Sequence, residues 1–592
     1  MTHTLVTLAR EMMDPVTVRE VAPSTRFAFS LLGGLIRHGV RDIVVAPGAR
    51  SQALALAAEQ LSRLGDVRLH VRIDERAAGF LALGLSIETG VPTVVITTSG
   101  TAVSNLHPAV LEAHHSGVPL LILTADRPEE LRGIASNQTT HQSDIFGVAS
   151  RWSIDEPAPM PESDVDERGL ALAIKAFSIA TDAHAPGPVH LNLAFREPLS
   201  STVTPEQLEI LLAATSAIAE STNVAVNTLA PRSTAELERG PRTIVIAGTG
   251  AGPEAEELAH QGGWPLIAEI ASGARFGRNL IVGYRELLSQ AELIDGLQRI
   301  VVFGHPTLSR EVPALIGDAE RGIETIVIRG QQPEVYNPGH NVARVLDGVS
   351  VADGKVDRAW LGAWLSASRT LVAEHEAAIL EAHPETRAPD VATARSETPA
   401  SQRTFVKAEL AAVRVTVTRD MLVDAVWRFS WPHNRLVLGA SRLIRVADRW
   451  LPGKKIPVHA NRGLAGIDGT IATGIGIALA ATPALTRVLL GDLATLHDAG
   501  SMLFGRGEER PRIQVIVGND GGGSIFDLLE VAQSASVESV ERVLFTPHEV
   551  NFENLATAYG WHYVRVTNAG ELERALTGAG ADPELVEVVL AR

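Results

Sequence analysis

Short apolar runs alternate with amphipathic stretches along most of the chain. In the first 200 residues the apolar runs predict strands over 42–46, 67–73, 92–97 and 119–124. The stretches between them, with apolar residues at helical spacing, predict helices over 26–38, 77–87 and 101–115. Short apolar strands separated by helices indicate a parallel sheet that is covered by helices on both faces.

The same alternation returns twice. A second unit has predicted strands over 243–247, 265–269, 299–303 and 325–329, and a third over 436–438, 458–460, 487–490 and 513–517. Residues 201–240 are polar and are expected to connect the first two units, while the proline-bearing segment 381–418 is expected to be an exposed linker. We therefore predict an α/β protein of three doubly wound parallel-sheet domains: 1–200, 241–380 and 419–592.

One uncharged run, 469–486, could suggest a membrane span, but it carries glycines, threonines and Pro483. It is better explained as a buried core helix, so no membrane span is expected. Charged residues interrupt the first 20 positions, where a signal peptide would need an apolar core. These features predict a cytoplasmic protein.

Composition and charge narrow the classes of function. The 592 residues are 45% hydrophobic and 20% charged, which is ordinary for a folded protein, and there is no cysteine. Disulfides, iron–sulfur clusters and thiolate zinc sites are therefore excluded. The formal charge of −17 argues against general nucleic-acid binding. The negative net charge still permits binding of anionic small molecules, because a few converging arginines can make one cleft locally positive.

Small and polar residues collect directly after the predicted strands of units one and three, where open parallel sheets bind ligands. Both units also share one pattern, a strand followed by a small-residue turn, an arginine and a helix. We infer two facing halves of one site. The segments concerned are 48–50, 75, 98–101 and 126–127 in unit one, and 439–441, 461–463, 491–492 and 519–521 in unit three.

Glu75 is a candidate for proton transfer. It follows the alternating segment 67–73 and shares the face of Ile73 if that strand extends to it. A partly desolvated carboxylate in that place could share a proton with a ligand. The alternative is a solvated strand-end residue that pairs with Arg72 or Arg76.

Asp492 and Asn519-Asp520 close two adjacent strands of unit three. Their hard oxygen ligands suit Mg²⁺ bound to a phosphorylated cofactor, and glycines 521–523 would let main-chain N–H groups approach phosphate oxygens. The alternative is a pair of acidic loop residues beside a flexible turn.

Unit two contains the glycine-rich turn 248–253, and Glu269 ends its next predicted strand. This half-matches a dinucleotide-binding fingerprint, but Pro253 occupies the position of the third glycine. A structural turn is the favoured interpretation, with nicotinamide or flavin binding as the alternative.

Several segments together resemble the thiamine-diphosphate enzymes. Within them the chain is most similar to the family of menaquinone-pathway synthases that make 2-succinyl-5-enolpyruvyl-6-hydroxy-3-cyclohexene-1-carboxylate (SEPHCHC). The segments are APGARSQAL (46–54), RIDERAAGF (72–80), TTSGTAVSNLHPAV (97–110), ADRPEELRGIASNQT (125–139), NRGLAGIDGT (461–470), GDLATLHD (491–498) and NDGGGSIF (519–526).

The resemblance implies a pyrimidine-binding domain, a middle Rossmann-like domain without nucleotide, and a diphosphate-binding domain. It implies thiamine diphosphate with Mg²⁺ (or Mn²⁺), bound between chains of a homodimer or a dimer of dimers. The implied reaction is decarboxylation of 2-oxoglutarate and addition of the succinyl carbanion to isochorismate. Another thiamine-diphosphate 2-oxoacid decarboxylase or carboligase, such as an acetohydroxyacid synthase, is the alternative.

The resemblance also assigns roles to residues. Glu75 would be catalytic, at N1′ of the aminopyrimidine, and Asp492, Asp520 and the Gly522 carbonyl would hold the metal, with Asn519 the alternative to Asp520. The residues expected at the cofactor are Pro47, Gly48, Thr98, Ser441, Ile467, Gly491, Leu493, Asn519, Ile525, Phe526 and Leu529. Those expected at the substrate carboxylates are Arg50, Arg127, Asn137, Gln138, Arg310, Arg445 and Arg462. Ala49 departs from the family, which usually has Ser there.

Overall fold

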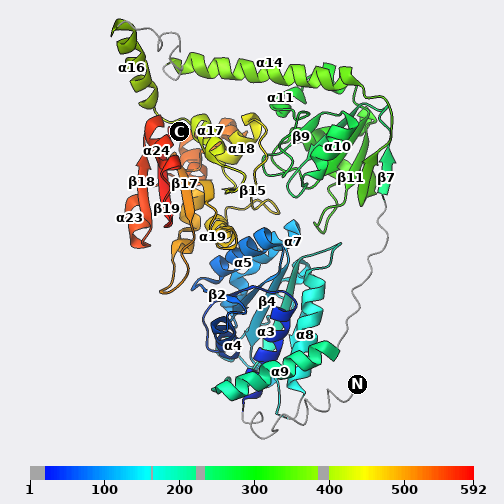
Figure 1. The fold of residues 1–592 in the computed structure, drawn as a ribbon, viewed down its shortest axis with the longest axis vertical. Coiled ribbons are helices and arrows are strands. Elements are labelled where there is room, and N and C mark those ends of the chain that lie inside the picture. Colours follow the sequence, from blue (N-terminus) through cyan, green and yellow to red (C-terminus); the bar gives the residue numbers. More distant parts are fainter. Residues whose placement is uncertain (1–20, 162–163, 222–233, 385–398) are drawn as a thin grey trace.

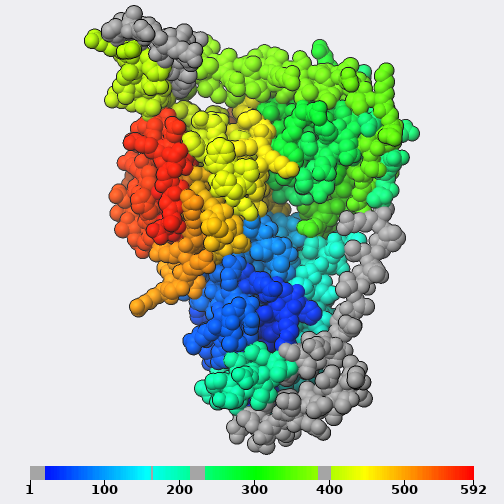
Figure 2. All heavy atoms as spheres, viewed as in Figure 1, coloured from blue at the N-terminus to red at the C-terminus, as the bar shows by residue number. Residues whose placement is uncertain are grey.

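The structure is a computed structural model that describes residues 21–161, 164–221, 234–384 and 399–592. In the described residues, each of the three predicted α/β units contains one large parallel sheet, and the middle unit also has a separate two-stranded parallel sheet. Figure 1 shows the middle domain (green) and the C-terminal domain (yellow to red) side by side, with the N-terminal domain (blue to cyan) across from both. The space-filling view in Figure 2 shows the three domains packed against one another.

The N-terminal sheet has six strands in the order β2-β1-β3-β4-β6-β5, all parallel. Its central strands are apolar and buried on both faces, as expected for a sheet between two helical layers. The strands are β1 (Asp42–Val45), β2 (Arg68–Val71), β3 (Thr93–Thr97), β4 (Leu120–Asp126), β5 (Trp152–Glu156) and β6 (Pro188–Ala194). The helices are α3 (Pro23–Arg37), α4 (Gln52–Arg63), α5 (Glu75–Thr89), α6 (Thr101–Asn105), α7 (His107–Ser116), α8 (Val165–Ala180) and α9 (Pro205–Ser221).

The C-terminal sheet repeats this topology strand for strand. Its order, β15-β14-β16-β17-β19-β18, becomes that of the N-terminal sheet when each domain's strands are numbered from its own first strand. The strands are β14 (Arg435–Leu438), β15 (Val458–His459), β16 (Thr486–Gly491), β17 (Ile513–Asn519), β18 (His562–Val566) and β19 (Glu584–Val589). The α-helices are α17 (Arg419–Phe429), α18 (Arg442–Trp450), α19 (Thr470–Ala480), α20 (Asp492–His497), α21 (Val531–Ser534), α22 (Val537–Val540), α23 (Phe552–Ala558) and α24 (Ala569–Thr577).

The middle domain has a five-stranded parallel sheet in the order β12-β11-β10-β8-β9 and a separate pair, β7 with β13. The strands are β7 (Thr234–Leu237), β8 (Thr243–Ala247), β9 (Leu266–Ala268), β10 (Arg299–Phe303), β11 (Glu324–Ile328), β12 (Val342–Leu346) and β13 (Gly348–Val351). The helices are α10 (Glu254–Gly262), α11 (Tyr284–Leu287), α12 (Ala291–Ile294), α13 (Glu311–Gly317) and the long α14 (Arg358–Ala382).

The two segments expected as connections are more ordered than predicted. Residues 205–221 form α9, which packs on α3 and buries Leu211 in the N-terminal core. Within 381–418, residues 399–413 form α16 (Pro399–Val413), which contacts α24. Residues 222–233 and 385–398 lie outside the described residues. Polar composition therefore concealed helices that are stabilised by tertiary contacts.

The N- and C-terminal domains meet through two equivalent helices. Helix α5 follows the second strand of its domain, α19 follows the second strand of the other, and the two pack against each other. A Cβ built on Gly84 would lie 2.1 Å from the Thr473 carbonyl oxygen, and one on Gly476 would lie 2.2 Å from the Leu81 carbonyl oxygen. The helices thus approach at backbone distance, and one hydrophobic core runs through both domains.

The uncharged run 469–486 contains α19, of which Thr470–Leu479 are buried, so the prediction of a core helix is confirmed. Among the described helices, none combines the length and the apolar character that a membrane crossing requires. The predicted helix over 101–115 is divided into α6 and α7 at Leu106.

Candidate active site

Glu75 is the first residue of α5 and not part of a strand. Strand β2 ends at Val71, so the strand does not extend to Glu75 and the condition for Glu75 to share the face of Ile73 is not met. Asp74 caps the helix by accepting from the main-chain N–H groups of Arg76 (2.9 Å) and Ala77 (3.3 Å). The Glu75 carboxylate is half-buried and accepts from Asn105 Nδ2 at 3.4 Å. A helix N-terminus favours a negative charge, so the local field suits a carboxylate here.

Arg76 fastens this end of α5 to the C-terminal domain. Its guanidinium donates to the His497 carbonyl oxygen at 2.8 Å and lies 3.1 Å from His497 Nδ1. His497 ends the six-residue helix α20, which begins at Asp492. At about 1.5 Å per residue, Asp492 lies roughly 8 Å farther along that helix. The two predicted half-sites of one chain are thus linked but not superimposed.

The turn after β1 lies beside the end of β3. Pro47 and Ala49 are exposed, while Gly48 is half-buried and accepts from the buried Ser51 hydroxyl at 3.1 Å. Thr98, at the end of β3, is 7% exposed. The turn therefore presents Pro47, Gly48 and Thr98 at one edge of the sheet, as the strand order requires.

Arg127 lies in a pocket of polar groups at the same edge. It is 8% exposed, and its guanidinium donates to the Ser99 hydroxyl and, at 2.6 Å, to the Gln138 carbonyl oxygen. Burial, together with the positive charge of Arg50, lowers the pKa of Arg127. Arg50 donates to the Phe195 carbonyl oxygen at 3.1 Å, and Asn137 is exposed. Two cations held this close provide a binding place for an anionic group.

Asp492 is a buried carboxylate at the end of β16. It is 2% exposed, accepts from the Leu493 main-chain N–H at 2.7 Å, and lies 3.1 Å from His548 Nε2. Burial, followed by the negative charge of Asp520, raises its pKa. A second carboxylate that disfavours the ionisation of Asp492 forms, together with Asp492, a donor set that a divalent cation would stabilise.

Asp520 and Asn519 face different neighbours. Asp520 accepts from Arg419 at 2.6 Å and from the Ser524 hydroxyl. Asn519, the last residue of β17, donates to Glu587 at 2.6 Å and accepts from the Gly521 main-chain N–H at 3.1 Å. After burial, the negative charge of Asp520 is the second cause of the raised pKa of Asp492.

The turn after β17 needs glycine. Gly521 has φ +79°, a left-handed conformation that other residues adopt at a cost. A Cβ on Gly522 would lie 2.4 Å from the Phe545 carbonyl oxygen. The turn therefore requires glycine at 521 for its backbone conformation and at 522 for its close approach to Phe545. Within the ranges that the structure describes, no cluster of three or more histidine, aspartate or glutamate side chains is placed to hold a metal.

The remaining predicted cofactor contacts line the same edge of the C-terminal sheet. Ser441 caps α18 by accepting from the Leu443 main-chain N–H at 3.2 Å, and Gly491 accepts from Thr495 at 2.9 Å. The apolar members are all partly buried, which leaves surface for a ligand; they are Ile467, Leu493, Ile525, Phe526 and Leu529.

Three predicted substrate arginines lie where the middle and C-terminal domains meet. Arg462 is 4% exposed and donates to Thr307, whereas Arg445 donates to the Ser441 carbonyl oxygen at 3.2 Å. Burial lowers the pKa of Arg445, and Arg462 adds to that effect. Arg310 is largely exposed and pairs with Glu530.

Sequence reasoning missed several partners of the predicted residues. Asn105, Arg419 and His548 contact Glu75, Asp520 and Asp492 respectively. Asn105 lies inside a segment that carried the resemblance, which was an available signal. Arg419 and His548 are far from their partners in sequence and follow no periodic pattern, so only the fold brings them together.

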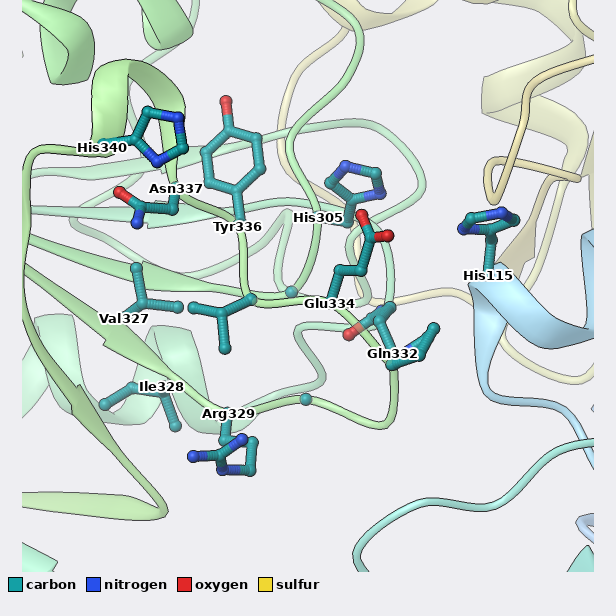
Figure 3. A pocket seen from close by; sticks show the side chains of 14 residues that line it. His115, His305, Val327, Ile328, Arg329, Gln332, Glu334, Tyr336, Asn337 and His340 are labelled. Carbon is teal, nitrogen blue, oxygen red and sulfur yellow. The ribbon is translucent and has the colours of Figure 1, made fainter. Parts of the chain in front are cut away.

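A cavity of about 450 Å³ lies away from these residues, at the ends of β10 and β11. Figure 3 shows His305, Tyr336 and His340 around it, with His115 of the N-terminal domain at its side. None of the predicted site residues lines it.

Two family models match the chain. Residues 25–148 match "Thiamine pyrophosphate enzyme, N-terminal TPP binding domain", and residues 449–588 match "Thiamine pyrophosphate enzyme, C-terminal TPP binding domain". Thiamine pyrophosphate is another name for thiamine diphosphate. Together with the paired six-stranded sheets, these matches define a thiamine-diphosphate enzyme.

Similar curated proteins narrow the class. A 2-succinyl-5-enolpyruvyl-6-hydroxy-3-cyclohexene-1-carboxylate synthase of Leifsonia xyli subsp. xyli is 54% identical over 96% of this chain and 97% of the relative. Synthases of the same name from Clavibacter michiganensis subsp. michiganensis (54%, covering 96% and 97%) and Kineococcus radiotolerans (40%, covering 96% of each) also match. The chain belongs to the SEPHCHC synthase family.

Proposed function

We propose that this chain is the enzyme that decarboxylates 2-oxoglutarate and adds the resulting succinyl group to isochorismate. The products are SEPHCHC and CO₂, in menaquinone biosynthesis. The observation that carries the proposal is the 54% identity over 96% of the chain to synthases of this reaction. Glu75 and the Asp492–Asp520 pair, the two residue sets that the chemistry needs, are both present in matching domains.

Thiamine diphosphate, when bound, supplies a thiazolium carbon that adds to a 2-oxo acid and stores the electron pair left by CO₂. Glu75 would act on the cofactor's aminopyrimidine by exchanging a proton at N1′. Its place at the start of α5, with Asn105 as a donor at 3.4 Å, holds the carboxylate in one orientation. Thr98, Gly48 and Pro47 would bound the pyrimidine ring.

We propose that Asp492, Asp520 and the Gly522 carbonyl hold Mg²⁺ or Mn²⁺, which would fix the diphosphate. The buried carboxylate of Asp492, whose pKa is raised by burial and by Asp520, supports this role. A cation between the two would remove the repulsion that raises that pKa. Asn519 would lie next to the diphosphate and orient the glycine turn through Gly521.

Both substrates are dianions, so several cations are needed to bind them. Arg50 and Arg127 from the N-terminal domain and Arg445 and Arg462 from the C-terminal domain are the candidates, with Asn137, Gln138 and Ser441 as neutral donors. Burial lowers the pKa of Arg127 and of Arg445, and at Arg127 the positive charge of Arg50 adds to this effect while the negative charge of Asp126 opposes it. Arg310 is the weakest candidate, because Glu530 already pairs with it.

We propose a homodimer or dimer of dimers with sites shared between chains. Apolar side chains beside the site residues support this arrangement, because they would be covered by a second chain. Ile73 is 73% exposed two residues from Glu75, Leu464 is 54% exposed two residues from Arg462, and Leu528 is 61% exposed next to Leu529.

The test is incubation of the purified protein with thiamine diphosphate, Mg²⁺, 2-oxoglutarate and isochorismate, followed by mass analysis. The expected product has the mass of SEPHCHC and appears only when all components are present. Omitting isochorismate and supplying pyruvate in place of 2-oxoglutarate are the controls. Product from pyruvate alone would point to an acetohydroxyacid-synthase-like enzyme and contradict the proposal.

A further inference from the structure

Glu269 is a buried carboxylate that the proposed reaction does not use. It follows β9 in the middle domain and is 1% exposed. The carboxylate oxygen Oε1 accepts from the main-chain N–H groups of Thr307 (2.8 Å) and Leu308 (2.6 Å). Glu269 is therefore committed to the loop after β10 and cannot serve a nucleotide ribose, which disfavours the dinucleotide interpretation of the turn 248–253.

The glycine-rich turn 248–253 is likewise hydrogen-bonded to the loop after β10. The Thr249 main-chain N–H donates to the His305 carbonyl oxygen at 3.2 Å, and the His305 N–H donates to the Thr249 carbonyl oxygen at 2.9 Å. The glycine-rich turn thus uses its main chain to hold the same loop. The segments that follow β8 and β9 therefore both form hydrogen bonds with the loop of residues 304–308.

That loop holds Arg462 of the C-terminal domain. The Arg462 guanidinium donates to Thr307 Oγ1 through Nε (3.0 Å) and a terminal nitrogen (2.7 Å), and to the Thr307 carbonyl oxygen at 3.0 Å. Every one of these acceptors is on the residue whose N–H Glu269 binds. The chain of contacts therefore runs from Glu269 through Thr307 to Arg462.

The main chain after Arg462 is held from the N-terminal domain. Glu112 of α7 accepts from the main-chain N–H groups of Gly463 (2.7 Å) and Leu464 (2.9 Å). Arg462 is thus fixed at its guanidinium by the middle domain and at its backbone by the N-terminal domain. Three domains determine the direction of one guanidinium.

The charge state of Glu269 suits a structural acceptor. Burial, followed by the negative charge of Asp448, raises its pKa to about 8, while Arg462 acts in the opposite direction. The second oxygen, Oε2, has no hydrogen-bond partner. A neutral carboxyl group keeps Oε1 as an acceptor without placing a full charge in the core.

We propose that Glu269 is a positioning residue for substrate binding: by fixing the 304–308 loop, it sets the orientation in which Arg462 meets a substrate carboxylate. The inference rests on the proposed function, in which Arg462 binds substrate. Glu269 is not among the proposed substrate contacts, and its hydrogen-bonded route to Arg462 runs through Thr307.

The test compares Glu269→Gln with Glu269→Ala in the cofactor-loaded enzyme. Glutamine retains an acceptor at Oε1, so KM for both substrates should stay within about threefold of wild type. Alanine leaves two buried N–H groups unpaired, and KM for at least one substrate should rise about tenfold to a hundredfold, the scale of a charge-assisted hydrogen bond. Both kcat and hydrogen–deuterium exchange at the cofactor C2 should change less than about threefold in either variant.

A second pair of variants keeps the test decisive if Glu269→Ala does not fold. Thr307→Val removes the hydroxyl that accepts from Arg462 and should raise the same KM, whereas Thr307→Ser should restore it. Combined with Glu269→Ala, Thr307→Val should add less than its separate effect, because both act on one contact chain. Glu156→Ala, which removes a buried carboxylate on the far edge strand β5, is the matched control and should leave KM unchanged.

Wild-type KM values in Glu269→Ala and in Thr307→Val would overturn the inference. So would a fall in kcat and C2 exchange with KM unchanged, because that pattern indicates general loss of structure. Failure of the proposed function gives a different result, since the wild-type protein would then make no product from 2-oxoglutarate and isochorismate.

Discussion

Asn105 donates its side-chain amide to the Glu75 carboxylate at 3.4 Å, so the first turn of α5 is tied to the last residue of α6. Both residues lie in segments that follow strands of the N-terminal sheet. This contact restricts the orientation of the carboxylate from a neighbouring helix. A group that must meet a single ring nitrogen of a cofactor requires such a restriction.

Replacement of Glu75 by Gln should slow turnover by about 10²–10⁴-fold, the usual worth of a general acid–base group. The variant should keep its melting temperature and its thiamine diphosphate, because glutamine can still accept from Asn105. Hydrogen–deuterium exchange at the cofactor C2, measured by NMR after acid quench, checks the step directly. Glu59→Gln on the exposed side of α4 is the matched control. Exchange at the wild-type rate would remove Glu75 from the mechanism.

Asp492→Ala and Asp520→Ala should each weaken retention of thiamine diphosphate by at least about tenfold, since each removes one charge from the proposed metal site. Asn519→Ala should have a smaller effect. Cofactor fluorescence titration at fixed Mg²⁺ measures all three variants. If Asn519→Ala proves worse than Asp520→Ala, the side-chain ligand is Asn519 and the assignment moves by one residue.

A mixture of Glu75→Gln and Asp492→Ala chains should regain activity after subunit exchange. In a heterodimer with shared sites, one site contains both substitutions and the other site contains neither. Turnover should approach half that of wild type per heterodimer, with heterodimers counted by native mass spectrometry. Either variant alone is the control. Heterodimers without turnover would show that each site belongs to one chain.

The buried Asp498 predicts a pH dependence of stability. It caps α19 by accepting from the N–H groups of Ile471 (2.7 Å) and Ala472 (3.0 Å). Burial raises its pKa to about 6, above the ordinary value of 3.8. Between those two values the folded state binds more protons than the unfolded state. The free energy of unfolding should therefore fall as pH rises through that window, by at most about 3 kcal/mol.

Asp498→Asn removes this titration while keeping an oxygen acceptor for the helix. The melting temperature of both proteins is measured between pH 4 and pH 7. Over that range the melting temperature of Asp498→Asn should decline less than that of the wild type, because the contribution of Asp498 is absent. Asp424→Asn, an exposed carboxylate on α17, provides the control. Parallel curves for wild type and Asp498→Asn would contradict the prediction.

The strands were predictable because they are buried on both faces and read as short apolar runs, as with Val94–Ile96 and Val515–Val517. Glu75 could share the face of Ile73 only if the strand extended past 73, but Asp74 caps the helix that begins at Glu75. The segment 205–221 looked like a connection, since its helix depends on packing against α3. Contacts such as Arg462 with Thr307 join positions 155 residues apart, and sequence patterns carry no signal at that range.

The packing of α5 on α19 has the self-complementary character of a twofold interface, although it lies within one chain. Equivalent helices of two equivalent sheets meet, and each offers a glycine to a carbonyl group of the other. Gly84 and Gly476 are therefore reciprocal: enlarging either one would act as a wedge between the domains. Since Glu75 begins α5, and Asp498 ties the start of α19 to the end of α20, such a wedge would tilt the proposed proton-transfer residue relative to the loop proposed to bind the metal. In the proposed mechanism, the spacing of the two domains therefore also sets the relative orientation of the two half-sites that each chain contributes to its shared sites.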